Sequence, residues 1–459
     1  MLRADRHTVS LAEDLFVLSD AQDKSAEFLE GLDLELQDPE PFEDWLRMMR
    51  GRVPAEDYAG KAKVGHAQSR RASHPAMRER VALGLLISVL SGANRDDLIR
   101  ADHFVDDAVM FLTHVTMIDI HDFRQSESLS FPFPMHSGTG PTHWLQSIVE
   151  RRSTATLVRL RLTEAATRRL IWISDPVQIQ DSGATDKAIQ LGELVADRLR
   201  ANPVLAETPD LFPLTALAAL FSLDAGLIAR TEQQLTRAYQ AGGSPIFECI
   251  RAFAQVFKVH EGFGALSELG VGELTRLIAG IPVSDPLLPL CKSLVGYALH
   301  MLHAENDLAF HLIEDAWLRA PNLALNLDHL AILRMAQGDI AGAETAFRNC
   351  LQVGSLSPWR YTYDVTGAMI YLAKGDAAQS LYYANQALFR QPKYLGALRY
   401  AMAGLALSDK AQDARRMLQR IHVIRPDYDL SDWAEGYLRR TPQHLGSRLV
   451  QSLHRNALL

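Results

Sequence analysis

Histidine is the residue type in this chain whose clustering could support metal chemistry. His300, His303 and His311 lie close together in the sequence, and Glu305 lies among them. A metal site would need several of these side chains to converge, each held by a hydrogen-bond partner behind it. Histidines on the exposed faces of repeated helices give the same sequence pattern without forming a site. We favour that second interpretation and predict no metal-binding residue.

A second group, His114, His121 and Asp122, contains residue types that serve in general acid–base catalysis. The group is predicted to straddle the end of a strand over residues 115–120. No nucleophile or second carboxylate motif stands beside it. The chain also lacks the Gly-x-x-x-x-Gly-Lys-Ser/Thr loop, the Gly-x-Gly-x-x-Gly turn, the Gly-x-Ser-x-Gly elbow and the His-Glu-x-x-His motif. We therefore predict that the protein is not an enzyme and has no catalytic or cofactor-binding residue.

Aromatic residues gather in the last part of the chain, and they are the candidate partner-binding residues: Trp359, Tyr361, Tyr363, Tyr371 and Tyr382. Tyrosine and tryptophan are favoured in the centres of protein interfaces, so these side chains could anchor a partner peptide. The alternative interpretation is that they pack between neighbouring helices of the same chain.

The elements that would position these aromatics are predicted to be helical throughout residues 206–459. Four prolines recur there at a nearly regular interval, namely Pro321, Pro358, Pro392 and Pro426. A turn followed by a helix precedes each of the last three prolines, at residues 338–347, 375–383 and 409–417. A helix–turn–helix unit of this length that ends in proline resembles the tetratricopeptide repeat. The resemblance implies a helical solenoid whose concave face binds protein partners.

Residues 81–205 show a different periodicity. Residues 81–90 form a continuous apolar run of strand length, typical of a strand covered on both faces. Residues 95–112 and 184–199 have the spacing of amphipathic helices. Residues 154–163 and 168–174 alternate as the two strands of a hairpin. Strands alternating with helices predict a small α/β domain, so the expected fold class is mostly α with a central α/β domain.

Residues 1–80 divide by charge. Residues 1–44 contain 13 acidic and 3 basic residues, whereas residues 50–80 contain 8 basic and 3 acidic residues. Residues 1–52 are predicted to form a short strand near residues 8–11 and two helices. Residues 53–80 are a polar basic linker that is too poor in apolar residues to fold alone. The linker would serve as a solvated tether, or it would contact DNA phosphates or an acidic protein face.

The 459 residues suggest about three domains at roughly 150 residues each. The formal net charge of −8 offers nucleic acid no overall basic field. The apolar runs are shorter than the roughly 20 residues of a membrane-spanning helix. Three widely spaced cysteines fit free thiols in a reducing compartment. These features predict a cytoplasmic protein without a membrane partner.

Specific motifs give the chain a resemblance to a family. Residues 2–11 and the pattern Phe28-Leu-Glu-Gly-Leu-Asp33 with Phe42-Glu-Asp-Trp-Leu46 resemble the junction of the winged helix and the bacterial transcriptional activator domain in SARP-type transcriptional regulators. The hairpin at residues 160–172 resembles an edge of the TolB-N-like domain, with Arg168 in place of the turn glycine. Residues 356–400 are similar to the repeat domain that ends these regulators.

The resemblance implies a regulatory or signalling role in transcription, exerted through protein–protein interaction by the helical repeats. In the family, the helix that reads the major groove precedes the strand that begins at Leu2. We therefore expect residues 1–52 to be a remnant of the winged-helix and activator region, and direct DNA recognition to be absent from this chain. The alternative function is a repeat scaffold that assembles a complex unrelated to transcription. An enzyme built on residues 81–205 is the least favoured hypothesis.

Overall fold

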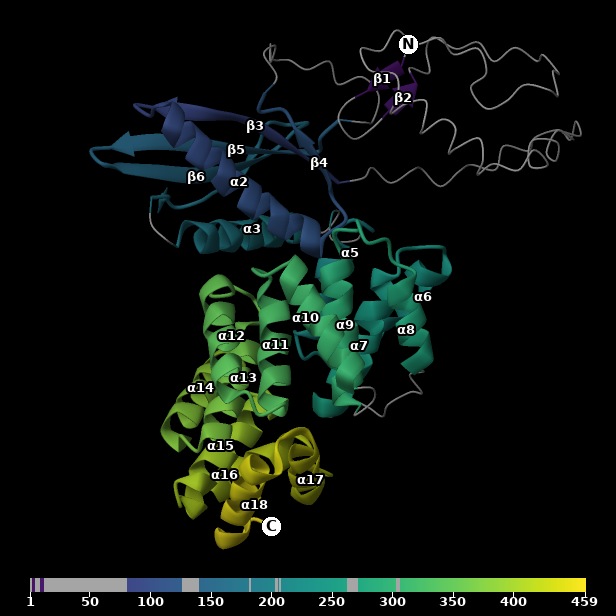
Figure 1. The fold of residues 1–459 in the computed structure, drawn as a ribbon, viewed down its shortest axis with the longest axis vertical. Helices are drawn as coiled ribbons and strands as arrows, with labels where there is room; N and C mark the ends of the chain where they lie inside the picture. The colour runs from purple at the N-terminus through teal and green to yellow at the C-terminus, as the bar shows by residue number, and fades with distance from the viewer. Residues whose placement is uncertain are drawn as a thin grey trace, which may run out of the picture. The chain divides into compact units, whose positions relative to one another are not determined.

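The computed structural model describes residues 2–4, 9–11, 81–125, 140–180, 183–202, 205, 208–261, 271–302 and 306–459 (Figure 1). The chain divides into two compact units, Met1–Ala76 and Met77–Leu459. In the first unit, β1 (Leu2–Ala4) pairs antiparallel with β2 (Val9–Leu11), which confirms the predicted short strand. The other elements predicted for residues 1–52, and the linker at residues 53–80, lie outside the described residues.

The second unit begins with a mixed sheet. Its strands are β3 (Ala82–Ser91), β4 (Asp119–Asp122), β5 (His143–Arg152), β6 (Ala155–Glu164), β7 (Leu170–Ile173) and β8 (Val177–Gln178). The strand order is β4-β3-β5-β6-β7, and β8 also pairs with β6. β3 runs parallel to β4 and β5, whereas β6 pairs antiparallel with β5, β7 and β8. The predicted hairpin is therefore confirmed as β6 and β7.

Two helices, α2 (Arg95–Val115) and α3 (Ala184–Arg200), pack on each other beside this sheet (Figure 1). Alternate residues of β5 and β6 are buried, as a sheet with one covered face requires. The helices approach closely at Gly192, where an added Cβ would lie 2.4 Å from Ala108 O. The predicted stripe of α3 is buried at all four positions, Ala188, Leu191, Val195 and Leu199.

The prediction that residues 81–90 are covered on both faces is wrong for the second half of the strand. Ile87, Val89 and Leu90 are exposed. The reason is that one face of the sheet is not covered by the helices. Ser88 bonds to buried Ser147 and lies on the covered face, whereas Val89 pairs with Ile148, which alternates with the buried residues of β5 and lies on the other face.

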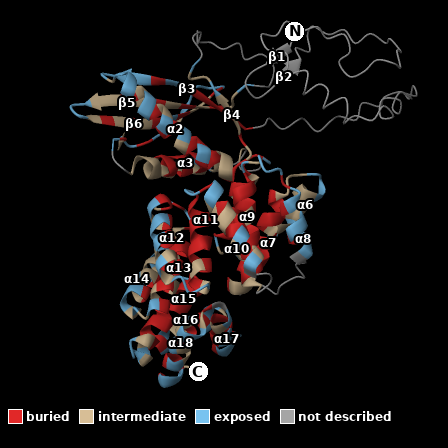
Figure 2. Ribbon diagram, viewed as in Figure 1, coloured by how far each residue is buried: buried red, intermediate tan, exposed pale blue. Residues whose placement is uncertain are grey.

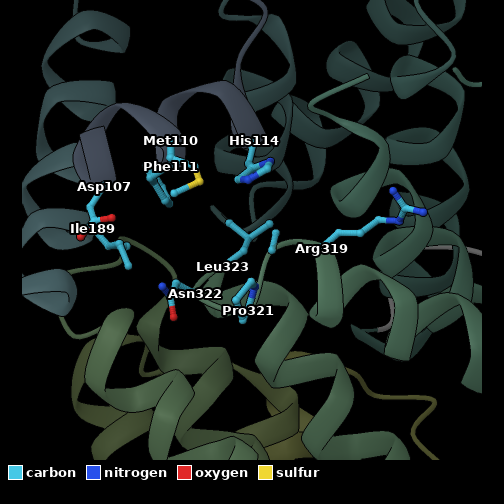
Figure 3. A pocket seen from close by; sticks show the side chains of 10 residues that line it. Asp107, Met110, Phe111, His114, Ile189, Arg319, Pro321, Asn322 and Leu323 are labelled. Atoms are coloured by element: carbon cyan, nitrogen blue, oxygen red, sulfur yellow. The ribbon is translucent and has the colours of Figure 1, made fainter. Parts of the chain in front are cut away.

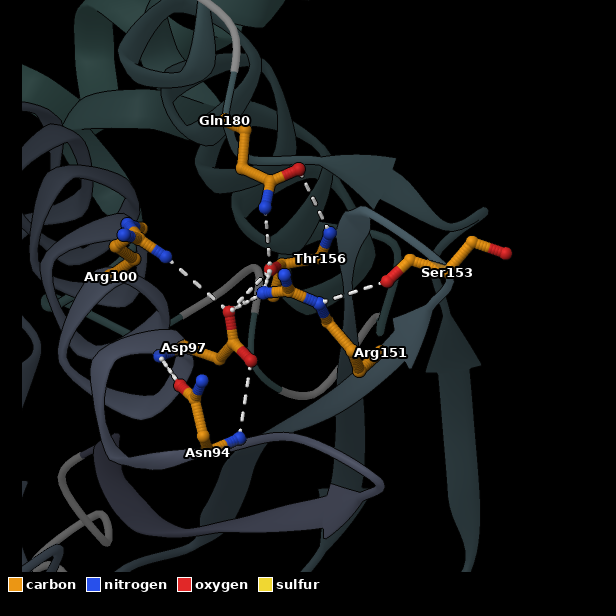
Figure 4. A network of polar contacts seen from close by, with 7 residues as sticks. All are labelled: Asn94, Asp97, Arg100, Arg151, Ser153, Thr156 and Gln180. Atoms are coloured by element: carbon orange, nitrogen blue, oxygen red, sulfur yellow. Dashed lines mark hydrogen bonds and ion pairs between the residues drawn. The ribbon is translucent and has the colours of Figure 1, made fainter.

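A buried polar network ties the start of α2 to the β5–β6 hairpin (Figure 4). Asn94 and Asp97 form a capping box at the N-terminus of α2. The Asp97 carboxylate also accepts hydrogen bonds from Thr156 Oγ1 at 2.5 Å and from Arg151 Nη1 at 2.8 Å. The hydrogen bond from Thr156 lowers the pKa of Asp97. Since its carboxylate is fully satisfied by these groups, we assign Asp97 a structural role.

The remainder of the chain is helical throughout its described part. The helices are α5 (Phe212–Leu220), α6 (Ala225–Gln240), α7 (Ile246–Glu261), α8 (Val271–Ala279), α9 (Leu288–Met301), α10 (Asn306–Arg319), α11 (Ala324–Ala336), α12 (Ile340–Val353), α13 (Arg360–Lys374), α14 (Ala377–Arg390), α15 (Leu395–Leu407), α16 (Ala411–Ile424), α17 (Leu430–Arg440) and α18 (Gln443–Arg455). The fold is thus mostly α with an α/β part. None of the described helices is both long and apolar enough to cross a membrane.

The helices from α11 onward come in pairs whose turns repeat. Gly338 and Gly375 follow the first helix of two pairs and adopt the left-handed conformation, with φ of 85° and 81°. The next residue, Asp339 or Asp376, then caps the second helix through its side chain. Each of the four repeated prolines lies in the loop between one pair and the next. The predicted turn-and-helix segments are therefore present.

Buried residues line the facing sides of these helices (Figure 2). The α/β part contacts them directly, because Gln190 Nε2 on α3 donates to Gln352 O on α12 at 2.7 Å. His114 Nδ1 at the end of α2 lies 2.8 Å from Pro286 O. Met77–Leu459 forms one compact unit, and the domain boundary between residues 205 and 206 stays a prediction.

Candidate functional site

Three of the five candidate partner-binding aromatics lie in the interior. Trp359, Tyr361 and Tyr363 are 6%, 3% and 1% exposed. The Tyr361 hydroxyl donates to Phe221 O at 2.6 Å, and the Trp359 ring stacks on the Phe221 ring with centroids 5.2 Å apart. Trp359 Nε1 donates to the Tyr363 hydroxyl at 2.8 Å. These three residues therefore fit the alternative interpretation, packing within the same chain: Phe221 at the end of α5 contacts Tyr361 and Trp359, and Trp359 contacts Tyr363.

The other two aromatics are more accessible. Tyr371 on α13 is partly buried, and its ring stacks on Tyr383 with centroids 5.5 Å apart. Its hydroxyl donates to Glu344 Oε1 at 3.0 Å, and burial raises its pKa to about 12. Tyr382 on α14 is 54% exposed. A role for Tyr371 and Tyr382 in partner binding stays a prediction.

Exposed apolar side chains mark a surface on α14 and α16 that the sequence analysis missed. Phe389 is 86% exposed and Val423 is 83% exposed, and each is the last residue but one of its helix. They are as far apart in the sequence as Pro392 and Pro426, so they occupy equivalent positions of the repeat. This spacing is the sequence feature that could have identified them. Arg420 Nη2 donates to Pro392 O at 3.2 Å, which holds the end of α16 beside the turn after α14. We name Tyr382, Phe389, Val423 and Ile424 the outer patch.

A cavity lies among the helices, and its empty space, with the open solvent at its mouth included, is about 660 Å³. Its walls come from α7 and from the first helix of successive pairs, α9, α11, α13, α15 and α17. We name it the inner pocket. It is lined by His260, Glu261, Tyr297, His300, Met301, Ile332, Met335, Val365, Met369, Tyr394, Gly396, Arg399, Tyr400, Trp433, Tyr437 and Thr441.

A buried ion pair forms the charged part of the inner pocket. Arg399 Nη2 lies 2.9 Å from Glu261 Oε1, and Gly396 N donates to Glu261 Oε2 at 3.4 Å. Glu261 is 6% exposed and Arg399 is 8% exposed. Arg399 Nε is buried without a hydrogen-bond partner. Burial raises the pKa of Glu261, and the neighbouring Arg399 charge opposes that rise.

A second cavity, with an empty volume of about 440 Å³, lies where α2 and α3 meet the loop between α10 and α11 (Figure 3). Met110, Phe111 and Ile189 line it from the α/β part, and Arg319 and Leu323 line it from the helical part. Its polar side chains come from different elements and form no hydrogen-bonded catalytic set.

Only His300 and His311 of the predicted histidine group lie among the described residues. His300 is buried on α9 and lines the inner pocket, so the expectation that it lies on an exposed helix face is wrong. His311 is exposed, as expected. His303 and Glu305 lie outside the described residues. Among the residues that the structure describes, no group of His, Cys, Asp and Glu side chains is placed to hold a metal ion.

The acid–base candidates also have separate surroundings. His114 belongs to the last turn of α2 and not to a strand, because α2 continues to Val115 and β4 begins at Asp119. Asp122 binds Arg124, with Oδ2 2.7 Å from Nη2. His121 stacks on Phe123 with ring centroids 6.3 Å apart.

The three cysteines, Cys249, Cys291 and Cys350, are free and buried, which confirms the expected free thiols. Burial raises the pKa of Cys291 and Cys350, which disfavours the reactive thiolate. No protein-family model matches the chain, and a search of curated proteins finds no match to it.

Proposed function

We propose that this chain is a cytoplasmic transcription-regulatory or signalling protein that acts through protein–protein interaction by its helical repeats. The observation that carries the proposal is the outer patch. Phe389 and Val423 are almost fully exposed on well-formed helices, although burying apolar surface is favourable by about 25 cal/mol per Å². Exposed apolar groups of this kind mark interaction sites when they gather in one place.

The repeated helix pairs support a tetratricopeptide-like solenoid as the framework of that function. The pairs α11/α12, α13/α14 and α15/α16 begin at Ala324, Arg360 and Leu395, so they follow one another at a nearly constant spacing. Pairs of this length cannot bury their apolar faces alone and are stable when stacked. In this proposal, partner binding uses the outer patch, because α5 and α7 occupy much of the face formed by α13 and α15.

The basic side chains beside the outer patch indicate the charge of the partner that it would bind. Lys393 and Arg420 are exposed beside the outer patch, at the turn after α14 and on α16. A partner that suits this surface has an apolar centre and an acidic rim, because complementary charge speeds association and excludes competing partners.

Substituting Phe389 tests the proposal. Phe389→Asp in the full chain is expected to weaken capture of the partner at least tenfold, since central aromatic residues often contribute about 2 kcal/mol or more to binding. The control is Val283→Asp, because Val283 is 72% exposed in the loop before α9, away from the outer patch. Thermal melting of both variants should match that of the wild-type protein.

The captured proteins and the transcripts decide the class of function. The proposal would be supported by two results together. Phe389→Asp would lose capture of RNA polymerase subunits or of another regulator, and deletion of the gene would alter transcripts. Partners unrelated to transcription, with unchanged transcripts, would contradict it and indicate the alternative repeat scaffold.

DNA binding by this chain gives a further prediction. With a net charge of −8, the full chain is expected to form no nanomolar, sequence-specific complex with duplex DNA in a gel-shift experiment. The experiment uses the promoter regions of the genes whose transcripts change on deletion. A specific shift at nanomolar protein would overturn the proposal that the chain acts without direct DNA recognition.

A further inference from the structure

We infer that the inner pocket binds a small organic anion, a carboxylate that carries an apolar body. The inference does not rest on the proposed function, since the outer patch and the inner pocket are formed by different residues. It rests on the hydrogen-bonding state of one buried ion pair and on the walls around that pair.

One hydrogen-bond donor of the ion pair, Arg399 Nε, has no acceptor. The Glu261 carboxylate accepts from Arg399 Nη2 and Gly396 N, and the backbone N–H of Leu395 contributes as well. Arg399 Nε, by contrast, is buried with no acceptor. A buried donor without a partner costs about 1–3 kcal/mol, and more for a charged group. The pocket therefore lacks an acceptor, which a carboxylate supplies.

The lining offers more side-chain nitrogen groups than carboxylates, which suits an anion better than a cation. Arg399, His260 and His300 carry the nitrogen groups, and Glu261 is the one carboxylate of the lining. An organic cation would have to compete with Arg399 for Glu261. An anion instead adds a second carboxylate to a guanidinium, whose fork of five N–H groups can serve more than one acceptor.

The remaining walls suit an apolar body. Met301, Met335 and Met369 bring flexible thioether side chains from three different helices, and such side chains adapt to irregular ligands. Trp433 and several tyrosines add aromatic surface.

The test compares three ligands of one chain length with the full-length protein, by calorimetric titration below their micelle concentrations. Decanoate is expected to bind saturably with one molecule per chain and to raise the melting temperature. Decan-1-ol and decyltrimethylammonium are expected to bind at least tenfold more weakly. Equal binding of all three ligands, tighter binding of the ammonium ion, or no saturable binding of decanoate would each overturn the inference.

Two variants locate the site. Glu261→Gln/Arg399→Gln removes both charges together and is expected to reduce decanoate affinity at least tenfold while leaving decan-1-ol binding unchanged. Met369→Trp fills the cavity and keeps the ion pair, so it is expected to abolish decanoate binding even if the first variant fails to fold. The control, Lys292→Gln/Asp315→Asn, removes an ion pair of 2.6 Å outside the pocket and should bind decanoate as the wild-type protein does. Unchanged decanoate affinity in a folded pocket variant would overturn the assignment.

Discussion

Arg399→Met is expected to lower the free energy of unfolding by about 3–5 kcal/mol, the usual cost of removing one partner from a buried ion pair. Methionine keeps the apolar part of the side chain but leaves the Glu261 carboxylate charged and buried without its cation. Glu261 would retain the backbone N–H groups of residues 395 and 396, which satisfy its lone pairs but supply no charge. Urea unfolding of the full chain, followed by circular dichroism, measures the effect.

The pH dependence of this loss separates a charge effect from a packing effect. Because burial already raises the pKa of Glu261, removing the Arg399 charge raises it further. The penalty in Arg399→Met is therefore expected to be larger at pH 8 than at pH 5, where Glu261 takes up a proton more readily. The control Glu261→Met/Arg399→Met removes both charges and should recover most of the lost stability. A loss below about 1 kcal/mol in the single variant would contradict this account, because it lies well under the cost of an unpaired buried charge.

Asp328→Asn is expected to stabilise the protein at alkaline pH. Asp328 is buried on α11, and desolvation raises its pKa to about 7. The nearby charge of Asp364 raises that pKa as well. Since the folded state holds the proton of Asp328 more tightly than the unfolded state, the contribution of this group to stability is greatest at low pH. That contribution is lost as the pH rises from about 4 to 7. Asparagine has nearly the same shape and stays neutral throughout this range.

The size of the effect follows from the pKa. A rise from 3.8 to about 7 corresponds to roughly 4 kcal/mol at pH 8, at about 1.4 kcal/mol per unit. Asp328→Asn and the wild-type protein should have similar melting temperatures at pH 4, and the variant should melt higher at pH 8. Asp427→Asn is the control, because the Asp427 side chain is 80% exposed. A difference between Asp328→Asn and wild type that stays constant from pH 4 to pH 8 would refute the assignment.

Local sequence signals predicted the elements of this fold well. Helix α3 has its apolar stripe at the predicted residues, and the turns at Gly338 and Gly375 begin the predicted helices. The hairpin of β6 and β7 is in place even though Arg168 takes a φ of 60° in its turn, where glycine is favoured. These features depend on residues that are close together in the chain.

The features that failed depend on distant residues. Whether Trp359 faces a partner or the interior is decided by Phe221, which lies much earlier in the chain. The exposure of Val89 depends on its pairing with Ile148 of β5, which lies on the uncovered face of the sheet. The inner pocket combines residues from His260 to Thr441, and no local periodicity shows that helices so far apart in the chain bring them together. The pattern of residues close together in the sequence predicts secondary structure, but it does not show which side chains remain exposed to solvent after the helices and strands pack.

The contacts between α5 or α7 and the later helices have a consequence for how the molecule unfolds. In a linear array of repeats, each repeat contacts and stabilises only its neighbours, so the ends can unfold first and the array can unfold in stages. Here Tyr361 bonds to Phe221 and Arg399 bonds to Glu261, across separations of 140 and 138 residues. Opening one of the middle pairs therefore also breaks contacts with the start of the helical part. These ties make the loss of structure more cooperative, and they slow folding, because long loops must close before the contacts form.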